Sequence, residues 1–367
     1  MGIVAERRMI HFDYVCNMQE HELYMRRCLE LAQLGAGSVS PNPMVGAVLV
    51  HQERIIAEGY HRKFGGPHAE AVVITEAQRR YGDDAAKLFR SATMYVSLEP
   101  CAHYGKTPPC AKLLADHRVG RVVIGCRDPF DQVNGRGIQL LKEAGIEVID
   151  GILAKDALWL NRRFVTRVQQ QRPYIILKWA QTADGYMAPA DGTQRWITGA
   201  VAKQLVHRWR SEEDAVLVGT KTALADHPQL TVRDWVGRNP KRILIDKHLA
   251  VPSDSELFDG SAETIVFNTL RSDWTERIKY IDVEDMDWYL PQKIAYQLYL
   301  MDVQSLIVEG GRKTLDLFVN AGLWDEARVF TSRDTWGGGI PSPILHSVAS
   351  ESRVSGPDRL DIYYRNH

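Results

Sequence analysis

The 367-residue sequence predicts two α/β domains that follow one another along the chain. Length is the first reason, because a single hydrophobic core rarely organises more than about 250–300 residues. The second reason is that short apolar runs alternate with helical stretches in both halves, which is typical of βαβ units. The third is the segment Q-Q-Q-R-P, whose Pro173 should stop any preceding helix. We expect domains at 18–165 and 172–367, with 1–17 as an N-terminal extension.

The N-terminal half predicts one α/β unit. Residues 1–17 lack clear periodicity, whereas Met18 directly precedes a good helix pattern, so Met18 is a candidate for the true start of the chain. The elements expected after this helix are, in order, a hairpin of strands at 45–50 and 55–59, a helix at 69–81, a strand at 93–98, a helix at 111–117, a strand at 121–125, a helix at 135–144 and a strand at 147–149.

The second half repeats the alternation with new elements. A helix-like stretch at 153–171 leads to Pro173, where an extended segment should begin. The expected strands lie at 174–178, 215–218, 242–245, 264–267, 305–308 and 326–330, and the helices between them include 200–210 and 313–321. No internal repeat is evident, so the two domains should differ.

Composition and charge limit the kinds of partner that we expect for this protein. Apolar residues make up 45% of the chain and charged residues 25%, which is usual for globular proteins, and no apolar run approaches the ~20 residues of a membrane span. A formal net charge of −1 creates no broad positive field, so neither long nucleic acid nor a membrane is an expected partner. Five cysteines without a signal-peptide pattern indicate a reducing compartment, and we expect the cytoplasm.

Four residues of the first half have the spacing of a catalytic zinc site. His68, Cys101 and Cys110 offer one imidazole and two thiolates, which suit zinc and leave its fourth position for water. Bound zinc lowers the pKa of that water to roughly 7. Glu70, at the start of a predicted helix, is placed to carry the proton to a leaving amine without ligating the metal. This order of residues is the signature of nucleobase deaminases.

The same residues allow other interpretations. Cysteines in such a chain are often buried small hydrophobes, and His103 is a candidate fourth ligand of a structural zinc. A zinc-stabilised binding module of that kind would need four protein ligands and would tolerate Glu70→Ala. The eight residues between the cysteines exceed the two of the usual signature and include Lys106 and Thr107, which are suited to hold an anionic group. We therefore expect a phosphorylated substrate.

The second half offers nucleotide sites but no obvious metal or nucleophile. Two predicted strands end in glycine before a helix, at 219–222 and at 309–311. Exposed backbone N–H groups at such junctions can receive phosphates. A tight turn that requires positive φ explains the same glycines without any ligand.

The N-terminal motifs resemble those of the bifunctional riboflavin-biosynthesis deaminase/reductase family. Four motifs carry the resemblance: S-P-N-P-x-V-G at 40–46, G-Y-H at 59–61, P-H-A-E at 67–70 and L-E-P-C-x-H-Y-G-K-T-P-P-C at 98–110. It implies a three-layer, cytidine-deaminase-like domain that removes the 2-amino group of 2,5-diamino-6-(5-phosphoribosylamino)pyrimidin-4(3H)-one with one Zn²⁺ per chain. Asn42 and His61 would contact this substrate, although a turn asparagine and a solvated strand-end histidine are ordinary alternatives.

The resemblance continues through the second half to about residue 330. K-W-A-x-T-x-D-G at 178–185, W-I-T at 196–198, L-x-G-x-x-T-x-x-A-D-x-P-x-L-T-V-R at 217–233 and V-E-G-G at 308–311 look like the reductase, whose fold is similar to dihydrofolate reductase. In that family NADPH reduces the ribosyl group to ribityl. The implied NADPH contacts are Ala180, Trp196, Thr222, Asp226, Gly310 and Gly311. The implied substrate contacts are Lys178, Gln194, Arg210, Leu230, Arg233 and Glu309.

Individual features of this half add to the expectation. Arg210 and Arg233 suit a 5′-phosphate, because guanidinium binds phosphate with two parallel hydrogen bonds, although a lone arginine is often a solvated surface residue. Gln194 stands where the family has serine, and the tail after residue 330 differs from the usual family ending. A homo-oligomer is expected from the resemblance alone. The rival enzyme hypothesis is a single-function deaminase of tRNA or a free nucleobase, with a non-catalytic C-terminal domain.

Overall fold

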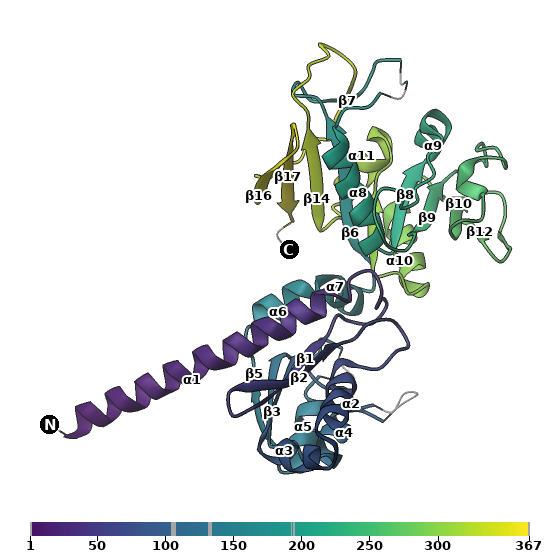
Figure 1. The fold of residues 1–367 in the computed structure, drawn as a ribbon. Coiled ribbons are helices and arrows are strands. Elements are labelled where there is room, and N and C mark those ends of the chain that lie inside the picture. The colour runs from purple at the N-terminus through teal and green to yellow at the C-terminus, as the bar shows by residue number, and fades with distance from the viewer. Residues whose placement is uncertain (1, 104–107, 131–133, 192, 194, 366–367) are drawn as a thin grey trace. The chain divides into compact units, whose positions relative to one another are not determined.

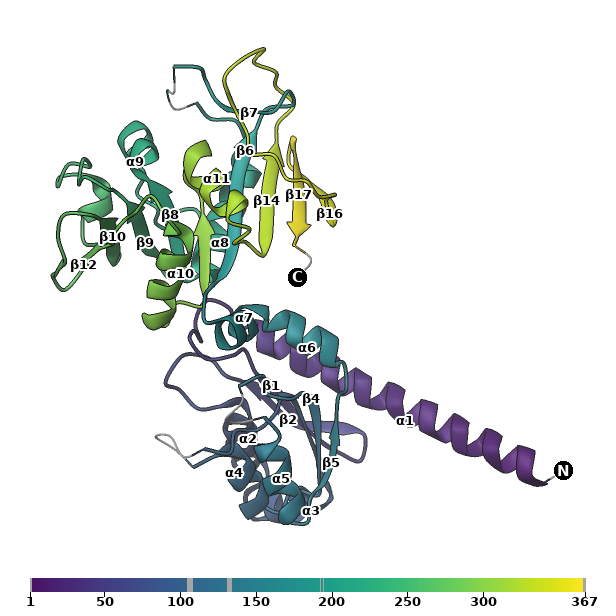
Figure 2. The ribbon, with the colours of Figure 1, turned by 180° about the vertical axis from the view of Figure 1, so that it is seen from behind.

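The computed structural model describes residues 2–103, 108–130, 134–191, 193 and 195–365, with side chains from Met18 onward. The chain divides into two compact units, residues 1–169 and 170–367. Both are built of helices on strands, in agreement with the predicted fold class (Figures 1 and 2). Within the described residues no helix is long and apolar enough to cross a membrane.

The N-terminal unit is organised around a five-stranded sheet of order β2-β1-β3-β4-β5. Strand β1 pairs antiparallel with β2 and β3, whereas β3, β4 and β5 run parallel. The strands are β1 (Gly46–His51), β2 (Arg54–Tyr60), β3 (Thr93–Leu98), β4 (Arg121–Cys126) and β5 (Glu147–Asp150). All five lie within a few residues of their predicted positions.

Helices cover both faces of this sheet. Alternate residues of a strand point to opposite faces, so Ala47 and Leu49 of β1 pack in one core and Val48 and Val50 in another. The first core includes side chains of α2 (Ala69–Tyr81), α3 (Ala85–Ser91), α4 (Cys110–Asp116) and α5 (Arg136–Glu143), and the second includes those of α1 (Gly2–Gln33). The unit is completed by a 3₁₀ turn η1 (Gly82–Asp84) and by α6 (Ala154–Leu160) and α7 (Arg162–Gln170). The result is three layers.

Helix α1 differs from the expectation at its start. The sequence pattern indicated a helix from Met18 onward, whereas α1 begins at Gly2. Residues 3–17 contain neither proline nor glycine, so nothing in them stops a helix from propagating toward the N-terminus even without an apolar stripe.

The C-terminal unit is organised around a ten-stranded sheet of order β11-β12-β10-β9-β8-β13-β6-β14-β17-β16. The strands from β12 to β14 in this order are all parallel. Its strands are β6 (Tyr174–Gln181), β8 (Ala215–Gly219), β9 (Lys241–Ile245), β10 (Thr264–Asn268), β11 (Asp273–Trp274), β12 (Ile278–Asp282), β13 (Ser305–Val308), β14 (Glu326–Thr331), β16 (Glu351–Ser355) and β17 (Asp358–Tyr364). A separate small sheet pairs β7 (Tyr186–Ala188) with β15 (Ile340–Pro341).

Helices lie on both faces of this sheet as well. Side chains of α10 (Leu290–Leu300) and α11 (Arg312–Asn320) pack in one core with Ile175 and Leu177 of β6. Those of α8 (Ala200–Glu212) and α9 (Thr220–Asp226) pack in the other with Tyr174 and Ile176, and a 3₁₀ turn η2 (Glu256–Phe258) adds to it. The six predicted strands are present. The sequence analysis missed β7, β11, β12, β15, β16 and β17. All but β17 consist mostly of exposed or half-buried residues, and in β17 charged residues interrupt the apolar ones, so none has a strong strand pattern.

Candidate functional site

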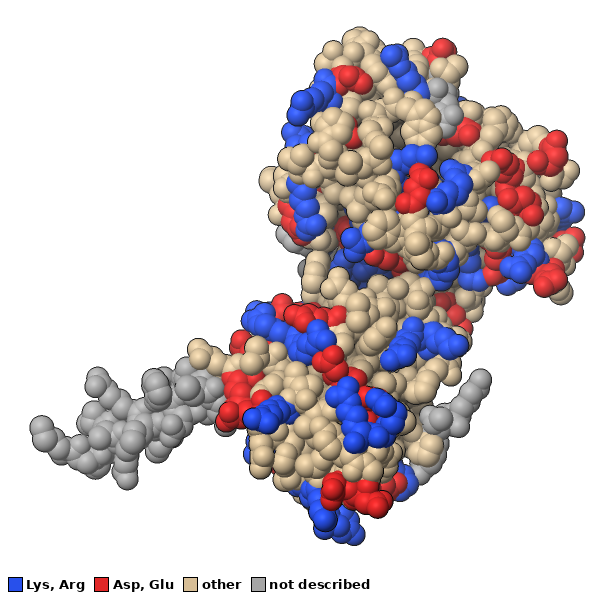
Figure 3. Space-filling view, in the orientation of Figure 1, with Lys and Arg blue, Asp and Glu red and all other residues tan. Residues whose placement is uncertain are grey.

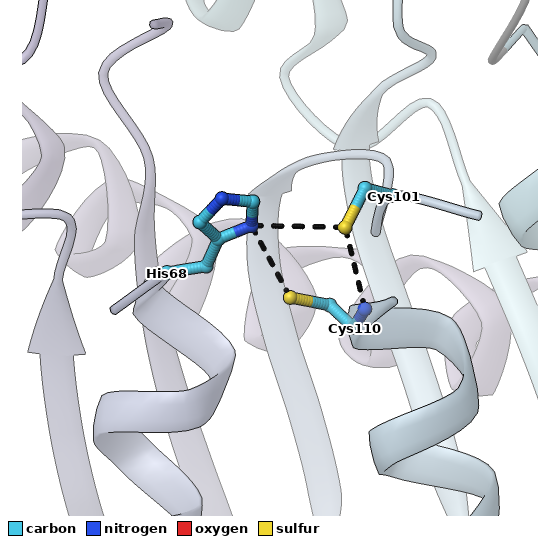
Figure 4. Close-up of side chains that lie close together, drawn as sticks. All are labelled: His68, Cys101 and Cys110. Atoms are coloured by element: carbon cyan, nitrogen blue, oxygen red, sulfur yellow. Dashed lines mark hydrogen bonds between the residues drawn. The ribbon is translucent and has the colours of Figure 1, made fainter. Parts of the chain in front are cut away.

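The three predicted zinc ligands lie together in the N-terminal unit. His68 Nδ1 is 3.7 Å from Cys101 Sγ and 3.4 Å from Cys110 Sγ, and the three ligand atoms lie within 4.8 Å of one another (Figure 4). A cluster of this size can hold a metal ion at its centre. One imidazole nitrogen and two thiolate sulfurs form a donor set that fits Zn²⁺.

Local structure brings the three ligands to the same place. His68 directly precedes α2, Cys101 follows the end of β3, and Cys110 is the first residue of α4. Because α2 and α4 pack on the same face of the sheet, the starts of both helices meet near the end of β3. The backbone N–H of Cys110 donates a hydrogen bond to Cys101 Sγ over 3.3 Å, which stabilises a thiolate there.

Within the cluster the pKa of the Cys101 thiol is lowered, whereas the pKa values of the Cys110 thiol and the Glu70 carboxyl are raised. The hydrogen bond with Cys110 lowers the pKa of the Cys101 thiol, so this thiol ionises first. Glu70 is 3% exposed on the first turn of α2. Burial raises the pKa of its carboxyl to about 7, and the charge of Cys101 adds to this rise while His68 opposes it. A carboxyl with a pKa near 7 can both accept and deliver a proton at neutral pH.

The structure brings Asn42 and His61 together. Their Nδ2 and Nε2 atoms are 3.1 Å apart, and His61 Nδ1 is 2.9 Å from the carbonyl oxygen of Pro67. A carbonyl only accepts, so Nδ1 carries the ring proton and Nε2 accepts from the Asn42 amide. His61 is thus buried and hydrogen-bonded to Pro67, the residue before His68. Its ring also packs edge-on against the ring of His68, with 5.5 Å between the ring centres. The alternative of a solvated His61 is wrong.

Glu99 is a residue of this site that the sequence analysis did not single out. Its carboxylate is 3% exposed and accepts hydrogen bonds from the backbone N–H groups of Asp128, Gly135, Gly137 and Ile138. It therefore ties the start of α5 to the chain that continues through Pro100 into Cys101. The signal was present, because Glu99 stands inside the motif before the first cysteine, where an acidic residue at a buried strand end needs partners.

The predicted anion-binding pair, Lys106 and Thr107, lies outside the described residues. Among the residues that are described, the metal-binding group consists of His68, Cys101 and Cys110, and His103 is not part of it. Three protein ligands agree with a catalytic zinc site, whereas the binding-module interpretation requires four.

In the C-terminal unit, three predicted substrate contacts form one buried ion cluster. Glu309 accepts hydrogen bonds from Arg210 Nε over 2.9 Å and Nη2 over 2.8 Å, and Lys178 Nζ lies 3.7 Å from its Oε2. The side chains of Arg210 and Glu309 are 11% and 9% exposed. Burial alone would raise the pKa of Glu309, but the charges of Arg210 and Lys178 outweigh it and bring the pKa to about 2.

The predicted glycine turns lie next to one another, because β8 and β13 are parallel neighbours. The N–H of Gly311 donates a hydrogen bond to Thr222 Oγ1 over 2.7 Å, which joins the turn after β13 to α9. A Cβ on Gly310 would lie 2.9 Å from Thr314 Cβ and 3.1 Å from the backbone nitrogen of Gly219. At Gly219 a Cβ would lie 2.5 Å from Thr314 Oγ1, so the Thr314 side chain leaves no room for a side chain at either glycine.

The other predicted reductase residues have different surroundings. Arg233 is exposed, and its guanidinium donates a hydrogen bond to the side chain of Gln229. Leu230 is buried with φ +55°, which is rare for a residue other than glycine. Trp196 is 69% exposed with the ammonium group of Lys203 5.8 Å from its ring centre. The remaining three are Ala180 and Asp226, both half-buried, and Gln194, which lies outside the described residues.

Comparison with known proteins matches both halves of the chain. Residues 18–126 match the family model of the cytidine and deoxycytidylate deaminase zinc-binding region, and residues 173–344 match that of the RibD C-terminal domain. The riboflavin biosynthesis protein RibD of Aquifex aeolicus is 38% identical over 321 residues, which are 86% of this chain and 88% of that protein. The RibD protein of Escherichia coli is 37% identical over 367 residues, which are 92% of this chain and 98% of that protein.

The fold has a close counterpart among crystal structures. A diaminohydroxyphosphoribosylaminopyrimidine deaminase/5-amino-6-(5-phosphoribosylamino)uracil reductase from Thermotoga maritima superposes with a TM-score of 0.85 at 37% identity. The match covers 94% of this chain and 99% of that chain.

These matches confirm the predicted fold, a cytidine-deaminase-like domain followed by a dihydrofolate-reductase-like domain. They do not support the rival hypothesis of a single-function deaminase, because a reductase model matches the second half. The predicted cofactors, Zn²⁺ and NADPH, follow from the two matched domains and from the His-Cys-Cys group. The chain therefore belongs to the RibD family of bifunctional riboflavin biosynthesis enzymes, with a zinc-dependent deaminase and an NADPH-dependent reductase in one polypeptide.

Proposed function

We propose that His68, Cys101 and Cys110 hold the zinc ion and that Glu70 is the proton carrier of the deaminase. The observation that carries this assignment is the cluster of three ligand atoms beside a buried carboxyl whose pKa is near 7. When bound, zinc makes hydroxide available at neutral pH. Glu70 would carry the two protons of the attacking water in turn, one to the neighbouring ring nitrogen N1 and one to the 2-amino group, which leaves as ammonia while the water oxygen becomes the new carbonyl.

Asn42 and His61 are proposed to contact the pyrimidine. Because His61 is fixed by Pro67, its ring holds the amide of Asn42 at a set position near the zinc ligands. Lys106 and Thr107 are proposed to bind the 5′-phosphate of the substrate. The phosphorylated form of the pyrimidine substrate rests on these two residues and on the arginines of the second domain.

In the reductase, the cluster of Lys178, Arg210 and Glu309 is proposed to face the substrate. Gln194, Leu230 and Arg233 complete the proposed substrate contacts, with Arg233 on the phosphate. Ring opening of the ribosylamine leaves C1′ double-bonded to the exocyclic nitrogen and turns the ring oxygen into a hydroxyl. Bound NADPH would supply a hydride to C1′, and a proton on that nitrogen would complete the ribityl chain. The protein mainly holds the two reactants in contact, since hydride transfer needs orientation more than a dedicated nucleophile.

The NADPH site is proposed at the carboxyl ends of β8 and β13. Gly219 directly precedes α9 and Gly311 directly precedes α11, and the backbone N–H groups at such helix starts suit a pyrophosphate. The proposed contacts around it are Ala180, Trp196, Thr222, Asp226 and Gly311.

Supplying the diaminopyrimidinone ribosylamino phosphate to the pure zinc-loaded protein with NADPH tests both activities. Ammonia release and NADPH oxidation are followed separately. We expect ammonia to appear with or without NADPH, and NADPH oxidation to follow it. Ammonia release without NADPH oxidation would contradict the proposed reductase, and oxidation of NADPH before any ammonia appears would contradict the proposed order.

The expectations about partners, oligomeric state, location and domain limits are also proposals. On the face that Figure 3 shows, Lys and Arg side chains are interspersed with Asp and Glu, which accords with the net charge of −1 and gives no support for a nucleic-acid partner. A homo-oligomer, a cytoplasmic location and the domain limits 18–165 and 172–367 are proposed on the grounds given by the sequence.

A further inference from the structure

We infer that His207 is a positioning residue of the reductase, which holds the backbone of Arg233 so that its side chain meets the substrate phosphate. The inference rests on the proposed function, in which Arg233 binds that phosphate. His207 lies on α8, three residues before Arg210, and is itself none of the predicted contacts.

The imidazole of His207 is fixed between two consecutive residues of the Arg233 segment. It is 2% exposed, and its Nδ1 accepts a hydrogen bond from the backbone N–H of Arg233 over 3.2 Å. Because Nδ1 is an acceptor, the proton of the neutral ring lies on Nε2. Nε2 points to Asp234, whose Oδ2 is 3.5 Å away and also binds Lys203 Nζ over 2.9 Å.

The segment that carries Arg233 is held at three consecutive residues. Arg210 Nη1 donates to the carbonyl of Thr231 over 3.4 Å, Asn239 Oδ1 accepts the N–H of Val232 over 2.9 Å, and His207 accepts that of Arg233. The same segment begins with the left-handed backbone of Leu230, a conformation that persists only where surrounding contacts hold it. The backbone at Arg233 is therefore fixed while its guanidinium remains exposed.

The surroundings keep His207 in the state that this contact requires. Burial lowers its pKa, and the charge of Arg210 lowers it further, with Arg233 and Lys203 in the same direction and Asp234 opposed. The ring is thus neutral at pH 7 and Nδ1 stays an acceptor. An apolar side chain would fill the same space on α8 without a desolvation cost, so the buried imidazole is explained by what it binds.

A matched pair of variants separates this role from simple packing. His207→Asn keeps an acceptor at the position of Nδ1, whereas His207→Leu has nearly the shape of asparagine without the acceptor. Both are made in the full zinc-loaded chain and assayed with NADPH on the deaminated phosphorylated pyrimidine. For His207→Leu we expect KM for this pyrimidine to rise ~10-fold, as loss of one hydrogen bond implies, with kcat and KM for NADPH nearly unchanged. His207→Asn should stay close to wild type.

The substrate supplies the second control. Once its phosphate is removed with a phosphatase, Arg233 has nothing to bind, and wild type and His207→Leu should then have the same KM. An unchanged KM for NADPH in all variants reports that the reductase unit is folded. Equal KM values for the asparagine and leucine variants, or a leucine effect that persists without the phosphate, would overturn the inference.

Failure of the proposed function has a different signature. In that case wild type itself fails to oxidise NADPH with the deaminated pyrimidine. Calorimetric binding of the same pyrimidine to the three proteins then decides the inference: a loss of affinity confined to the leucine variant supports it, and equal affinity in all three overturns it.

Discussion

Replacing Glu309 by glutamine should destabilise the C-terminal unit. In the wild type its carboxylate neutralises Arg210 and Lys178, whose side chains are 11% and 17% exposed. Glutamine has the shape of glutamate but no charge, so the variant leaves two buried cations without their counter-ion. Arg210 cannot lose its proton, whereas Lys178 can, because burial already lowers the pKa of Lys178.

Two estimates of the cost agree. The pKa of Glu309 falls from 4.5 to about 2, and at about 1.4 kcal/mol per pKa unit this corresponds to about 3 kcal/mol of stability from the charge. Breaking a buried ion pair by removing one partner costs ~3–5 kcal/mol in general. We take the lower figure because Lys178 can become neutral. For a unit of this size, about 3 kcal/mol lowers the unfolding temperature by roughly 6–12 °C.

Scanning calorimetry of the full zinc-loaded chain measures this fall in the unfolding temperature. The transition of the reductase unit is identified because NADPH raises it, and that of the deaminase unit because a zinc chelator lowers it. Glu263→Gln is the matched control, since Glu263 also faces two cations, Lys241 and Lys279, but their side chains are 33% and 42% exposed. Ion pairs whose lysines reach solvent to this extent contribute ~0–1 kcal/mol. If Glu309→Gln and Glu263→Gln lower the reductase transition equally, the argument from burial is wrong.

Four further predictions concern the same two sites. The difference in unfolding free energy between wild type and Glu309→Gln should be constant above pH 4.5 and shrink as the pH falls toward about 2, because a carboxyl with a depressed pKa stabilises the folded state only while it is ionised. Urea unfolding across pH 3–7 measures this difference. Glu70→Ala should lose ~10²–10⁴-fold in ammonia release while metal analysis finds zinc retained and NADPH oxidation on deaminated substrate continues; unchanged ammonia release would end the assignment of Glu70. Dialysis against a zinc chelator should abolish ammonia release, spare NADPH oxidation on deaminated substrate and be reversed by zinc, and joint loss of both activities would contradict separate sites. Gly310→Ala should weaken NADPH binding and lower the unfolding free energy of the reductase unit by ~1–3 kcal/mol, because the new Cβ would lie 2.9 Å from Thr314 Cβ. Gly338→Ala, where a new Cβ has nothing within 4 Å, should change neither quantity.

The sequence predicted that His68, Cys101 and Cys110 would lie together, and it predicted most of the alternation of strands and helices. Each depends on chemistry or periodicity within a short stretch: a histidine and a glutamate two residues apart, a cysteine at a strand end, and a cysteine that opens a helix. Residues so close in sequence keep their relation in any fold that forms the local element. The edge strands escaped prediction for the opposite reason, since their mostly exposed or half-buried residues carry no apolar signal.

The cluster of Lys178, Arg210 and Glu309 could not be predicted from the sequence, because only the tertiary structure brings these residues together. Strand β13 lies between β8 and β6 although both precede it in the chain, and this order sets Glu309 at the end of β13 close to Lys178 of β6. Arg210 reaches the same carboxylate from α8, 99 residues away in sequence. Sheet order follows from which apolar faces pack best over the whole unit, so spacing along the chain cannot reveal it.

The same holds for the contacts that fix the site residues. The sequence proposed Asn42, His61 and Arg233 as contacts one at a time, whereas the fold pairs the first two and holds the third through His207. Sequence by itself determined which chemical groups are present and which neighbours along the chain work together. Only the tertiary structure determines which distant groups meet in a buried place, where burial raises the pKa of Glu70 and the charges of Arg210 and Lys178 lower that of Glu309.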